Sequence, residues 1–343
     1  MSNRRNVLDL EIGSIFQNNW TVMQKLGQGG FGAVYKVQKV GREDKFYALK
    51  LERANIPNSV LKMDTNVLLK VRNKKHICRF VDCGRDENMN YLVMSLAGPN
   101  LEDLFEKAPN HKFSSSTSLQ IAIQATEALK DVHDAGFLHR DVKPANFAMG
   151  RNSQSGVLKL LDFGLARQIV TNDGKLRPPR ETLGFRGTER YASVNAHDDK
   201  ELGRHDDLIS LFYMIIEFKT GKLPWRNSDT FSVIGKRKKN AMETEWTSLS
   251  KRLQKIYTYM INLNYYKTPD YEWIMRQFAL QAKDEGANLE DKFDWEVQQP
   301  TTSKTKEANV SEYPYERQYE AEKTVKYNPK KQDENKEEKD NED

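Results

Sequence analysis

Alternation of apolar and polar positions dominates the N-terminal part of the chain and predicts β-strands. Residues 20–26 form one extended run, and residues 33–37 form a second run rich in β-branched and aromatic side chains. A third run, KFYALKLE at residues 45–52, places Lys50 on the same face as Ala48. Together these runs predict a β-rich region.

Helical periodicity replaces this alternation farther along the chain. A run that starts near Thr117 and ends near Gly136 carries one apolar face, made of Leu119, Ala122, Ala125, Leu129 and Val132. The segment LISLFYMIIEF, Leu208 to Phe218, is apolar nearly all round and is too short to span a membrane. It predicts a helix buried in a large core.

Four glycines lie in the stretch KLGQGGFGAVYKV at residues 25–37, between two predicted strands. A GxGxxG pattern occurs in dinucleotide-binding folds, in kinases and by chance. In a dinucleotide-binding fold the glycines open a helix, whereas here a strand follows them. The stretch therefore predicts a hairpin folded over a ligand. Lys50 is then either a lysine whose amine extends into solvent or a fixed cation for phosphates under the glycines.

Acidic and amide side chains recur in two motifs of the middle of the chain. FLHRDVKPANFAMG contains Asp141 and Asn146, and LLDFG contains Asp162. The segments between them are expected to form an antiparallel hairpin around the polar loop RNSQSG, with Met149 opposite Lys159. This register places Asn146 opposite Asp162. Two oxygen ligands of the kind that Mg²⁺ prefers would then converge at the open end of the hairpin.

Asp141 lies five residues before Asn146 and is expected beside this metal site, where its carboxylate can accept the proton of a hydroxyl group. Lys143 follows, and its ammonium group can neutralise charge on a phosphoryl group in transfer. Phosphoryl transfer needs this combination of cations, positioning and a modest base. The ordered presence of these motifs after Lys50 and the glycine stretch favours a phosphotransferase over chance tripeptides.

These motifs resemble those of eukaryotic protein kinases, and the resemblance extends from about Trp20 to Glu296. It implies a two-lobed α+β fold, with a small β-rich N-lobe at about residues 20–94 and a larger, mainly α-helical C-lobe at about residues 98–296. ATP and Mg²⁺ would bind between the lobes, and Ser95 to Gly98 would form the hinge.

The resemblance also implies roles for individual residues. It assigns ATP contacts to residues of the N-lobe and the hinge, namely Leu26, Gly27, Gly29, Gly32, Val34, Ala48, Lys50, Met94 and Leu96. It assigns catalysis to Lys50, Asp141 and Lys143, and magnesium binding to Asn146 and Asp162. The lysine in HRDVKPAN is typical of the serine/threonine class. Protein serine and threonine side chains are therefore the expected substrates.

One branch of the kinases is most similar to this chain. Ser193, Val194 and Asn195 stand where most kinases carry Ala-Pro-Glu, and they resemble the Ser-Ile-Asn of the casein kinase 1 group. Within that group, LRPPRETLGFRGTERYASVNAH and FDWE are most similar to the tau-tubulin kinases. Asp207 matches the aspartate that holds the catalytic loop, and a helix-capping role is the alternative.

Asp64 departs from the family pattern. It stands in VLKMDTNVLLK where active kinases carry the glutamate that orients Lys50, and it is one methylene shorter. A shorter side chain reaches the lysine only if its helix lies closer. The expectation is a tolerated substitution, with lowered activity as the competing outcome. The alternative function is a pseudokinase that acts as a scaffold.

Net charge is +5, and basic residues cluster in and after the predicted activation segment. In casein kinase 1 relatives a basic pocket near this segment binds a phosphorylated or acidic residue upstream of the target hydroxyl. Arg190 matches one pocket residue, and Lys236 is the second candidate, with Lys238 fitting after a small gap. The hypothesis is a kinase directed to acidic contexts, against solvated surface charge or, for KRKK, a nuclear-localisation patch.

Composition sets the remaining expectations. Residues 1–19 are expected to be an N-terminal extension, and residues 297–343, rich in charge and poor in aliphatic side chains, a disordered tail. Two cysteines and an N-terminus without the apolar core of a signal peptide fit a cytoplasmic protein, with nuclear access allowed. Without interleaved stacking aromatics, the basic segments do not predict nucleic-acid binding. A monomeric catalytic domain without a membrane role is expected.

Overall fold

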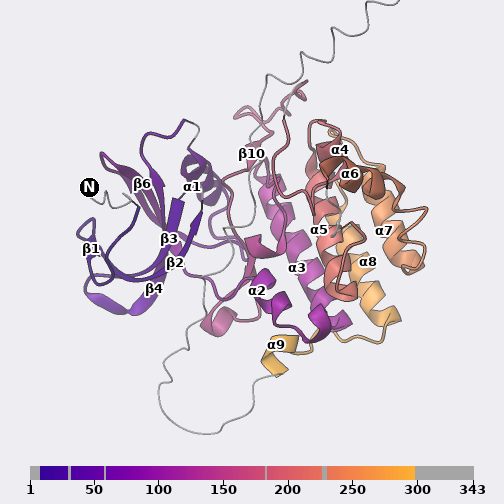
Figure 1. Ribbon diagram of the computed structural model, residues 1–343, viewed down its shortest axis with the longest axis horizontal. Coiled ribbons are helices and arrows are strands. Elements are labelled where there is room, and N and C mark those ends of the chain that lie inside the picture. The colour runs from indigo at the N-terminus through magenta and orange to yellow at the C-terminus, as the bar shows by residue number, and fades with distance from the viewer. Residues whose placement is uncertain (1–7, 30–31, 58, 182–183, 226–229, 298–343) are drawn as a thin grey trace, which may run out of the picture.

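The computed structural model describes residues 8–29, 32–57, 59–181, 184–225 and 230–297. Figure 1 shows a β-sheet with one helix on one side of the molecule and a larger body of helices on the other. The predicted two-lobed α+β fold is thereby confirmed. The predicted tail lies outside the described residues apart from Val297.

The N-lobe is built on an antiparallel sheet with the strand order β1-β2-β3-β4-β6-β5. Its strands are β1 (Ile15–Phe16), β2 (Trp20–Gly29), β3 (Gly32–Lys39), β4 (Arg42–Arg53), β5 (Phe80–Arg85) and β6 (Met89–Ser95). Gly29 pairs with Gly32 at the turn between β2 and β3. The glycine stretch therefore forms the hairpin that its alternating neighbours predict.

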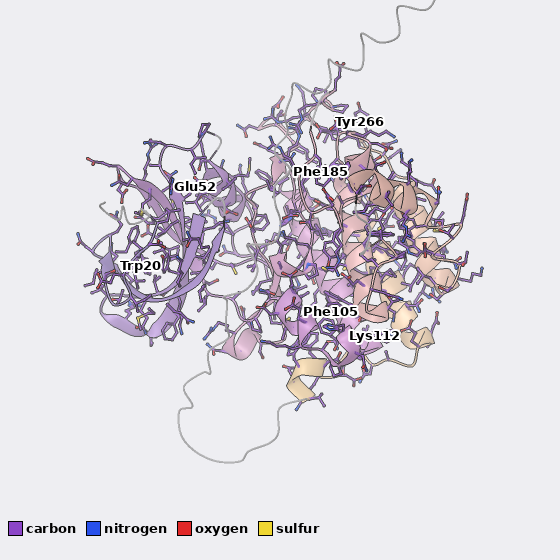
Figure 2. All side chains as sticks on the ribbon, in the orientation of Figure 1. Trp20, Glu52, Phe105, Lys112, Phe185 and Tyr266 are labelled. Atoms are coloured by element: carbon purple, nitrogen blue, oxygen red, sulfur yellow. The ribbon has the colours of Figure 1, made fainter. Side chains whose placement is uncertain are left out.

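The segment before Trp20 packs onto this sheet. Leu8 and Phe16 belong to a buried cluster with Trp20 and other residues of the sheet, and the hydroxyl of Tyr35 donates to the carbonyl oxygen of Leu8 at 2.9 Å. Figure 2 places Trp20 within the sheet. Residues from Leu8 onward are thus part of the N-lobe core, because the sheet would otherwise expose one apolar face.

Helix α1 (Val60–Lys70) packs against the inner side of the sheet (Figure 1). Its buried Leu61, Val67 and Leu68 belong to the large core that continues into the C-lobe. Among the described side chains, no residue of β4 belongs to that core. The apolar residues of α1 therefore share a core with Leu92 of β6 and with the C-lobe, and other contacts join the helix to β4.

The C-lobe is helical. Its helices are α2 (Leu101–Glu106), α3 (Ser115–Asp134), α4 (Val194–His197), α5 (Arg204–Thr220), α6 (Phe231–Asn240), α7 (Lys251–Ile261), α8 (Tyr271–Asp284) and α9 (Asp294–Val297). Helix α5 is buried along almost its whole length, as its apolar sequence predicts. Figure 2 places Phe105 of α2 in this lobe. None of the helices described is long and apolar enough to cross a membrane.

Two short pairs of antiparallel strands complete this lobe. Strand β7 (Phe137–Leu138) pairs with β10 (Arg167–Gln168), and β8 (Phe147–Met149) pairs with β9 (Leu158–Leu160). Met149 lies opposite Leu158, so the predicted pairing with Lys159 is wrong by one residue. All side chains of β8 and β9 are buried, so no alternation was available to define the register.

Candidate active site

Lys50 lies at the centre of the cleft, on β4. Its ammonium nitrogen lies 2.5 Å from Oδ2 of Asp64 and 2.8 Å from Oδ1 of Asp162. Burial by itself lowers the pKa of Lys50, but the charges of Asp162 and Asp64 outweigh burial and raise the pKa above its ordinary value. Lys50 is therefore a fixed cation, and not a lysine that extends into solvent.

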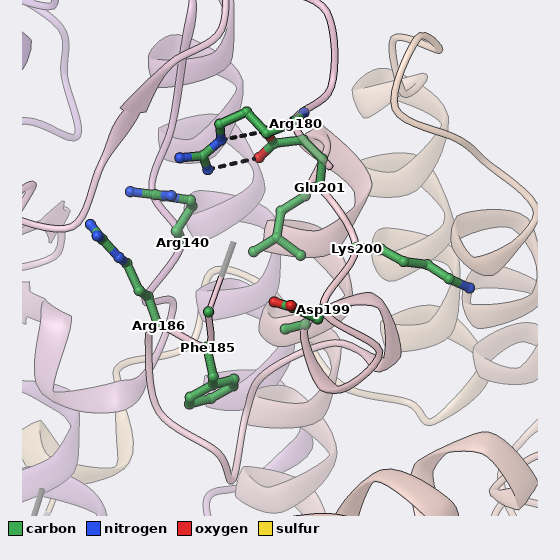
Figure 3. A pocket seen from close by; sticks show the side chains of 10 residues that line it. Arg140, Arg180, Phe185, Arg186, Asp199, Lys200 and Glu201 are labelled. Atoms are coloured by element: carbon green, nitrogen blue, oxygen red, sulfur yellow. Dashed lines mark hydrogen bonds and ion pairs between the residues drawn. The ribbon is translucent and has the colours of Figure 1, made fainter. Parts of the chain in front are cut away.

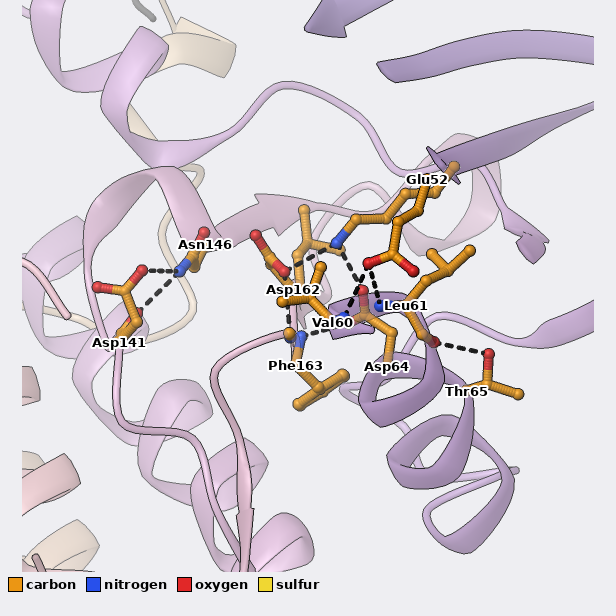
Figure 4. Close-up of polar contacts among 12 residues, drawn as sticks. Glu52, Val60, Leu61, Asp64, Thr65, Asp141, Asn146, Asp162 and Phe163 are labelled. Atoms are coloured by element: carbon orange, nitrogen blue, oxygen red, sulfur yellow. Dashed lines mark hydrogen bonds and ion pairs between the residues drawn. The ribbon is translucent and has the colours of Figure 1, made fainter. Parts of the chain in front are cut away.

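Asp64 of α1 reaches Lys50 despite its short side chain (Figure 4). Its other oxygen, Oδ1, accepts a hydrogen bond from the backbone amide of Phe163 at 2.5 Å. Burial raises the pKa of Asp64, against the opposing effect of Lys50. One short carboxylate thus joins α1, β4 and the segment that follows β9, because the helix lies close enough to the sheet.

Asp162 projects into the cleft from a left-handed backbone conformation, with a φ of 57°. Its Oδ1 also accepts from the amide of Gly164 at 3.2 Å. Burial opposes ionisation, but Lys50 outweighs it and lowers the pKa of Asp162 to about 2. Half of this side chain is exposed, so an ionised carboxylate faces the cleft.

Asn146 precedes β8, at the same open end of the β8–β9 hairpin as Asp162. Its carbonyl oxygen accepts from the amide of Leu161 at 2.8 Å, so the corrected register places Leu161, and not Asp162, opposite Asn146. Its side-chain nitrogen donates to the backbone oxygen of Asp141 at 2.8 Å (Figure 4). The side-chain oxygen of Asn146 makes no hydrogen bond within the described part of the chain. An amide oxygen and the Asp162 carboxylate fit a hard divalent cation.

Asp141 is held by three neighbours. Its Oδ1 accepts from the hydroxyl of Thr188 at 2.7 Å, and its Oδ2 lies 3.2 Å from both the Asn146 amide nitrogen and the Lys143 ammonium. Lys143 also donates to the Thr188 hydroxyl at 3.1 Å. The structure thus brings Asp141, Lys143 and Asn146 together, in the arrangement that positions a base for a hydroxyl group.

Asp207, in the first turn of α5, holds the catalytic loop from below. Its Oδ2 accepts from the amide of His139 at 2.7 Å and from Nε2 of His133 at 2.9 Å, while Oδ1 accepts from the amide of Arg140 at 2.8 Å. Burial opposes ionisation, but these donors outweigh it and lower the pKa of Asp207. The capping role belongs to Asp206, which accepts from the Gly203 amide.

The predicted adenine-contacting residues surround Lys50. Val34 lies opposite Lys50 in the β3–β4 register, and Ala48 lies opposite Met94 of β6. Leu26 is a partly buried residue of β2, and Leu96 follows β6 in the expected hinge. The register therefore places Val34, Ala48 and Met94 on the face of the sheet that carries Lys50. Apolar side chains of this kind suit a flat heteroaromatic ring.

Gly32 has a structural requirement of its own. A Cβ atom at this position would lie 2.0 Å from the carbonyl oxygen of Leu51 on β4. The strands β3 and β4 therefore approach each other at a distance that only glycine allows. Gly27, paired with Val34, and Gly29, paired with Gly32, complete the hairpin over the cleft.

The predicted anion pocket of Arg190 and Lys236 differs from the structure. The Arg190 guanidinium pairs with the fully buried carboxylate of Glu217. Lys238 is the lysine that reaches this region, and it donates to two carbonyl oxygens of the 189–192 segment at 2.6 and 2.7 Å. Lys236 is exposed on the same helix and makes no contact with Arg190 in the parts described. The sequence has four consecutive basic residues at positions 236–239, and their pattern does not show which of them is buried.

A second basic group lies where Arg140 of the catalytic loop meets the activation segment, and Arg140, Arg180 and Arg186 line one pocket there (Figure 3). Arg180 pairs with Glu201 through two hydrogen bonds of 2.8 and 3.2 Å. Burial, and then the charges of Arg186, Arg180 and Arg167, lower the pKa of Arg140 to about 10. Positive charge at this pocket therefore exceeds what the nearby carboxylates neutralise.

Two residues near the site were not singled out from the sequence. Thr188 joins Asp141 to Lys143, and its only sequence signal was its place after Gly187. Glu52 is buried beneath α1 and binds the start of that helix (Figure 4). The sequence signal for the role of Glu52 was its place in a predicted strand near Lys50. A charged residue in such a strand is rarely buried unless it has partners.

Comparison with known proteins agrees with this geometry. The family description "Protein kinase domain" matches residues 20–277. The chain is 40% identical over 288 residues to a probable serine/threonine-protein kinase of Dictyostelium discoideum, covering 83% of this chain and 58% of that relative. It is 38% identical over 295 residues to a putative serine/threonine-protein kinase of Caenorhabditis elegans, covering 84% of each.

A putative casein kinase I of Caenorhabditis elegans is 40% identical over 218 residues, covering 62% of this chain and 64% of that relative. The chain spans little more than half the length of the Dictyostelium relative. The matched residues include every side chain that surrounds Lys50 and Asp141 in the structure. The chain belongs to the protein kinase family, in its serine/threonine class.

Proposed function

We propose that this chain transfers the γ-phosphoryl group of ATP, with Mg²⁺, to serine and threonine side chains of proteins. The observation that carries the proposal is Lys50, fixed between Asp64 and Asp162 at 2.5 and 2.8 Å. ATP and Mg²⁺ supply the transferable phosphoryl group and the neutralising charge when bound. Asn146 and Asp162 are the residues that would hold the metal.

The chain's own residues then orient the acceptor. The Asp141 carboxylate receives the proton of the substrate hydroxyl, and Thr188 together with Asn146 fixes its orientation. Lys143, 3.2 Å from Asp141, places a positive charge beside the phosphoryl group. The complete set of phosphate-binding and metal-binding side chains favours catalysis over the pseudokinase alternative, which no similarity to the relatives supports.

We further propose that the chain belongs to the casein kinase 1 group, near the tau-tubulin kinases. It would then prefer serine and threonine residues in acidic or phosphorylated contexts. The relative described as a putative casein kinase I and the Ser193–Asn195 sequence support the group. The pocket of Arg140, Arg180 and Arg186 supports the preference, since guanidinium groups match carboxylate and phosphate geometry. The anion site proposed here is therefore this pocket, and not the surroundings of Arg190.

A pair of matched peptides tests this proposal. One carries a serine or threonine with an acidic or phosphorylated residue upstream, and the other is neutral at that position. Transfer from ATP with Mg²⁺ is expected to favour the charged peptide, and Arg186→Ala is expected to reduce that preference about fivefold, the upper end for one exposed ion pair. Arg177→Ala, an exposed arginine of the same segment outside the pocket, is the control. Equal rates on both peptides would refute the preference, and no transfer at all would refute the activity.

A further inference from the structure

Glu52 is a buried carboxylate that the reaction itself does not use. It lies two residues after Lys50 on β4, so the two side chains leave the same face of the strand. Only 1% of Glu52 is exposed to solvent. A glutamate is rarely buried so completely unless donors satisfy its carboxylate, so its partners explain its presence.

Those partners are the first residues of α1 (Figure 4). Oε1 of Glu52 accepts hydrogen bonds from the backbone amides of Val60 at 2.8 Å and of Leu61 at 3.2 Å. Oε2 accepts from the hydroxyl of Ser59, which caps the helix, and from the side-chain nitrogen of Asn90 at 3.2 Å. The amides at a helix N-terminus have no partner within the helix, so Glu52 satisfies two of them from a neighbouring strand.

The charge of Glu52 suits this position. The first turn of α1 contains no acidic residue of its own. A negative charge at a helix N-terminus interacts favourably with the helix dipole and with the exposed amides. Glu52 therefore supplies from β4 the anion that many helices carry in their own first turn.

The hydrogen bonds that join α1 to β4 run through Glu52 and Lys50. Its apolar residues pack into the core that continues into the C-lobe, and no described side chain of β4 belongs to that core. Glu52 binds the helix at Val60 and Leu61, and Lys50 binds it one turn later at Asp64. Both contacts start from the same strand, two residues apart, so the first determines how close the second can come.

We infer that Glu52 is a positioning residue that holds α1 close enough to β4 for the short Asp64 side chain to reach Lys50. In a kinase with glutamate in place of Asp64, the side chain itself covers the extra distance. In this chain the helix itself lies closer to β4, and Glu52 holds the helix in that position. The inference rests on the proposed kinase activity only for its kinetic readout.

The experiment is a double-mutant cycle between Glu52 and Asp64. Glu52→Leu keeps the volume of the side chain and removes every acceptor. It is expected to lower kcat/KM for ATP about tenfold, the consequence of losing hydrogen bonds to a charged group. Asp64→Glu is expected to give no gain in the wild type, because Asp64 already lies 2.5 Å from Lys50. In the Glu52→Leu background, Asp64→Glu should raise kcat/KM for ATP by at least about threefold.

If Glu52→Leu only lowered the stability of the whole protein, Asp64→Glu would not raise kcat/KM in the Glu52→Leu background alone. Hydrogen exchange of the α1 amides gives a second readout that needs neither ATP nor activity. Exchange at Val60 and Leu61 should rise about tenfold in Glu52→Leu, while the β3 amides keep their protection. Glu52→Gln, which keeps one acceptor oxygen, should change both readouts in the same direction by a smaller factor.

Asn90→Leu is the matched control, since it removes one donor to Glu52 and leaves both helix amides bonded. The inference is overturned if Asp64→Glu has the same effect in both backgrounds, or if α1 exchange in Glu52→Gln and Glu52→Leu equals that of the wild type. A wild type that transfers no phosphate would refute the proposed function instead, and the exchange measurement would still decide the role of Glu52.

Discussion

Two buried aspartates hold the two halves of the cleft, and they do so differently. Asp207 accepts from two backbone amides and one histidine, within the large core of the C-lobe. Asp64 accepts from one backbone amide and from Lys50, which it shares with Asp162. Their pKa values shift in opposite directions, downward for Asp207 and upward for Asp64, although both side chains are almost fully buried.

The difference lies in the donors. Backbone amides of a packed loop stay in place whether or not a ligand is bound, so the Asp207 half is preorganised. The Asp64 half depends on one lysine that also serves another carboxylate. The C-lobe half of the site therefore forms part of the folded core, whereas the N-lobe half depends on how closely one helix approaches one strand.

Asp162→Asn is the change with the largest expected effect, because Asp162 serves both halves. It removes a carboxylate that Lys50 binds and that a metal ion requires, so phosphate transfer should fall by about a hundredfold to a thousandfold. Initial rates of transfer to casein check this. Asp173→Asn, which disturbs an exposed ion pair with Lys175 and a hydrogen bond from the Thr171 hydroxyl, should leave the rate unchanged. Comparable rates in the two variants would remove Asp162 from the mechanism.

Asp207→Asn and Asp64→Asn should separate stability from activity. An amide at 207 places an NH₂ group against donors, and breaking such a buried network costs about 3 kcal/mol. The melting temperature should therefore fall by several degrees in Asp207→Asn. Asp64→Asn leaves Lys50 paired with Asp162, so it should lower the affinity for ATP with a smaller change in melting temperature. Differential scanning calorimetry beside nucleotide titration measures both. Equal melting temperatures would contradict the comparison.

The smallest expected effect is a difference in pH dependence. Because the pKa of Asp207 is lowered when folded, its contribution to stability is complete above pH 3.8 and is lost as the pH falls below that value. The pKa of Asp64 is raised, so its contribution is largest below pH 3.8 and is lost as the pH rises. Urea midpoints between about pH 5 and pH 3 should therefore fall less in Asp207→Asn than in the wild type, and more in Asp64→Asn. Parallel curves would contradict the opposite shifts.

Much of this arrangement could be predicted from the sequence, because phosphoryl transfer demands particular side chains at particular points. The strands and helices followed from a change of period along the chain, whereas their arrangement in two lobes was implied by the resemblance to protein kinases. Lys50, Asp162 and Asn146 lie around one cleft as their motifs predicted. The reach of Asp64 was left open, and the position of α1 decides it.

Other features depend on packing that the sequence pattern does not contain. The β8–β9 register was wrong by one residue because both strands are buried on both faces. The lysine that reaches the 189–192 segment is Lys238 and not Lys236, because the packing of α6 buries only one lysine of the run of four basic residues. Glu52 gave only an unexplained charge in a strand, since its first partner follows seven residues later, at Ser59.

The N-terminal segment carries a practical consequence. The match to the protein kinase family description begins at Trp20, but the folded unit includes Leu8 and Phe16, which cover the outer face of the sheet. A chain trimmed to the family boundary would leave the hydroxyl of Tyr35 without the backbone of Leu8 and Leu10, and would present an apolar sheet surface to neighbouring molecules. The family match and the buried core thus begin at different residues, and a domain produced alone should retain the chain from Leu8 onward at least.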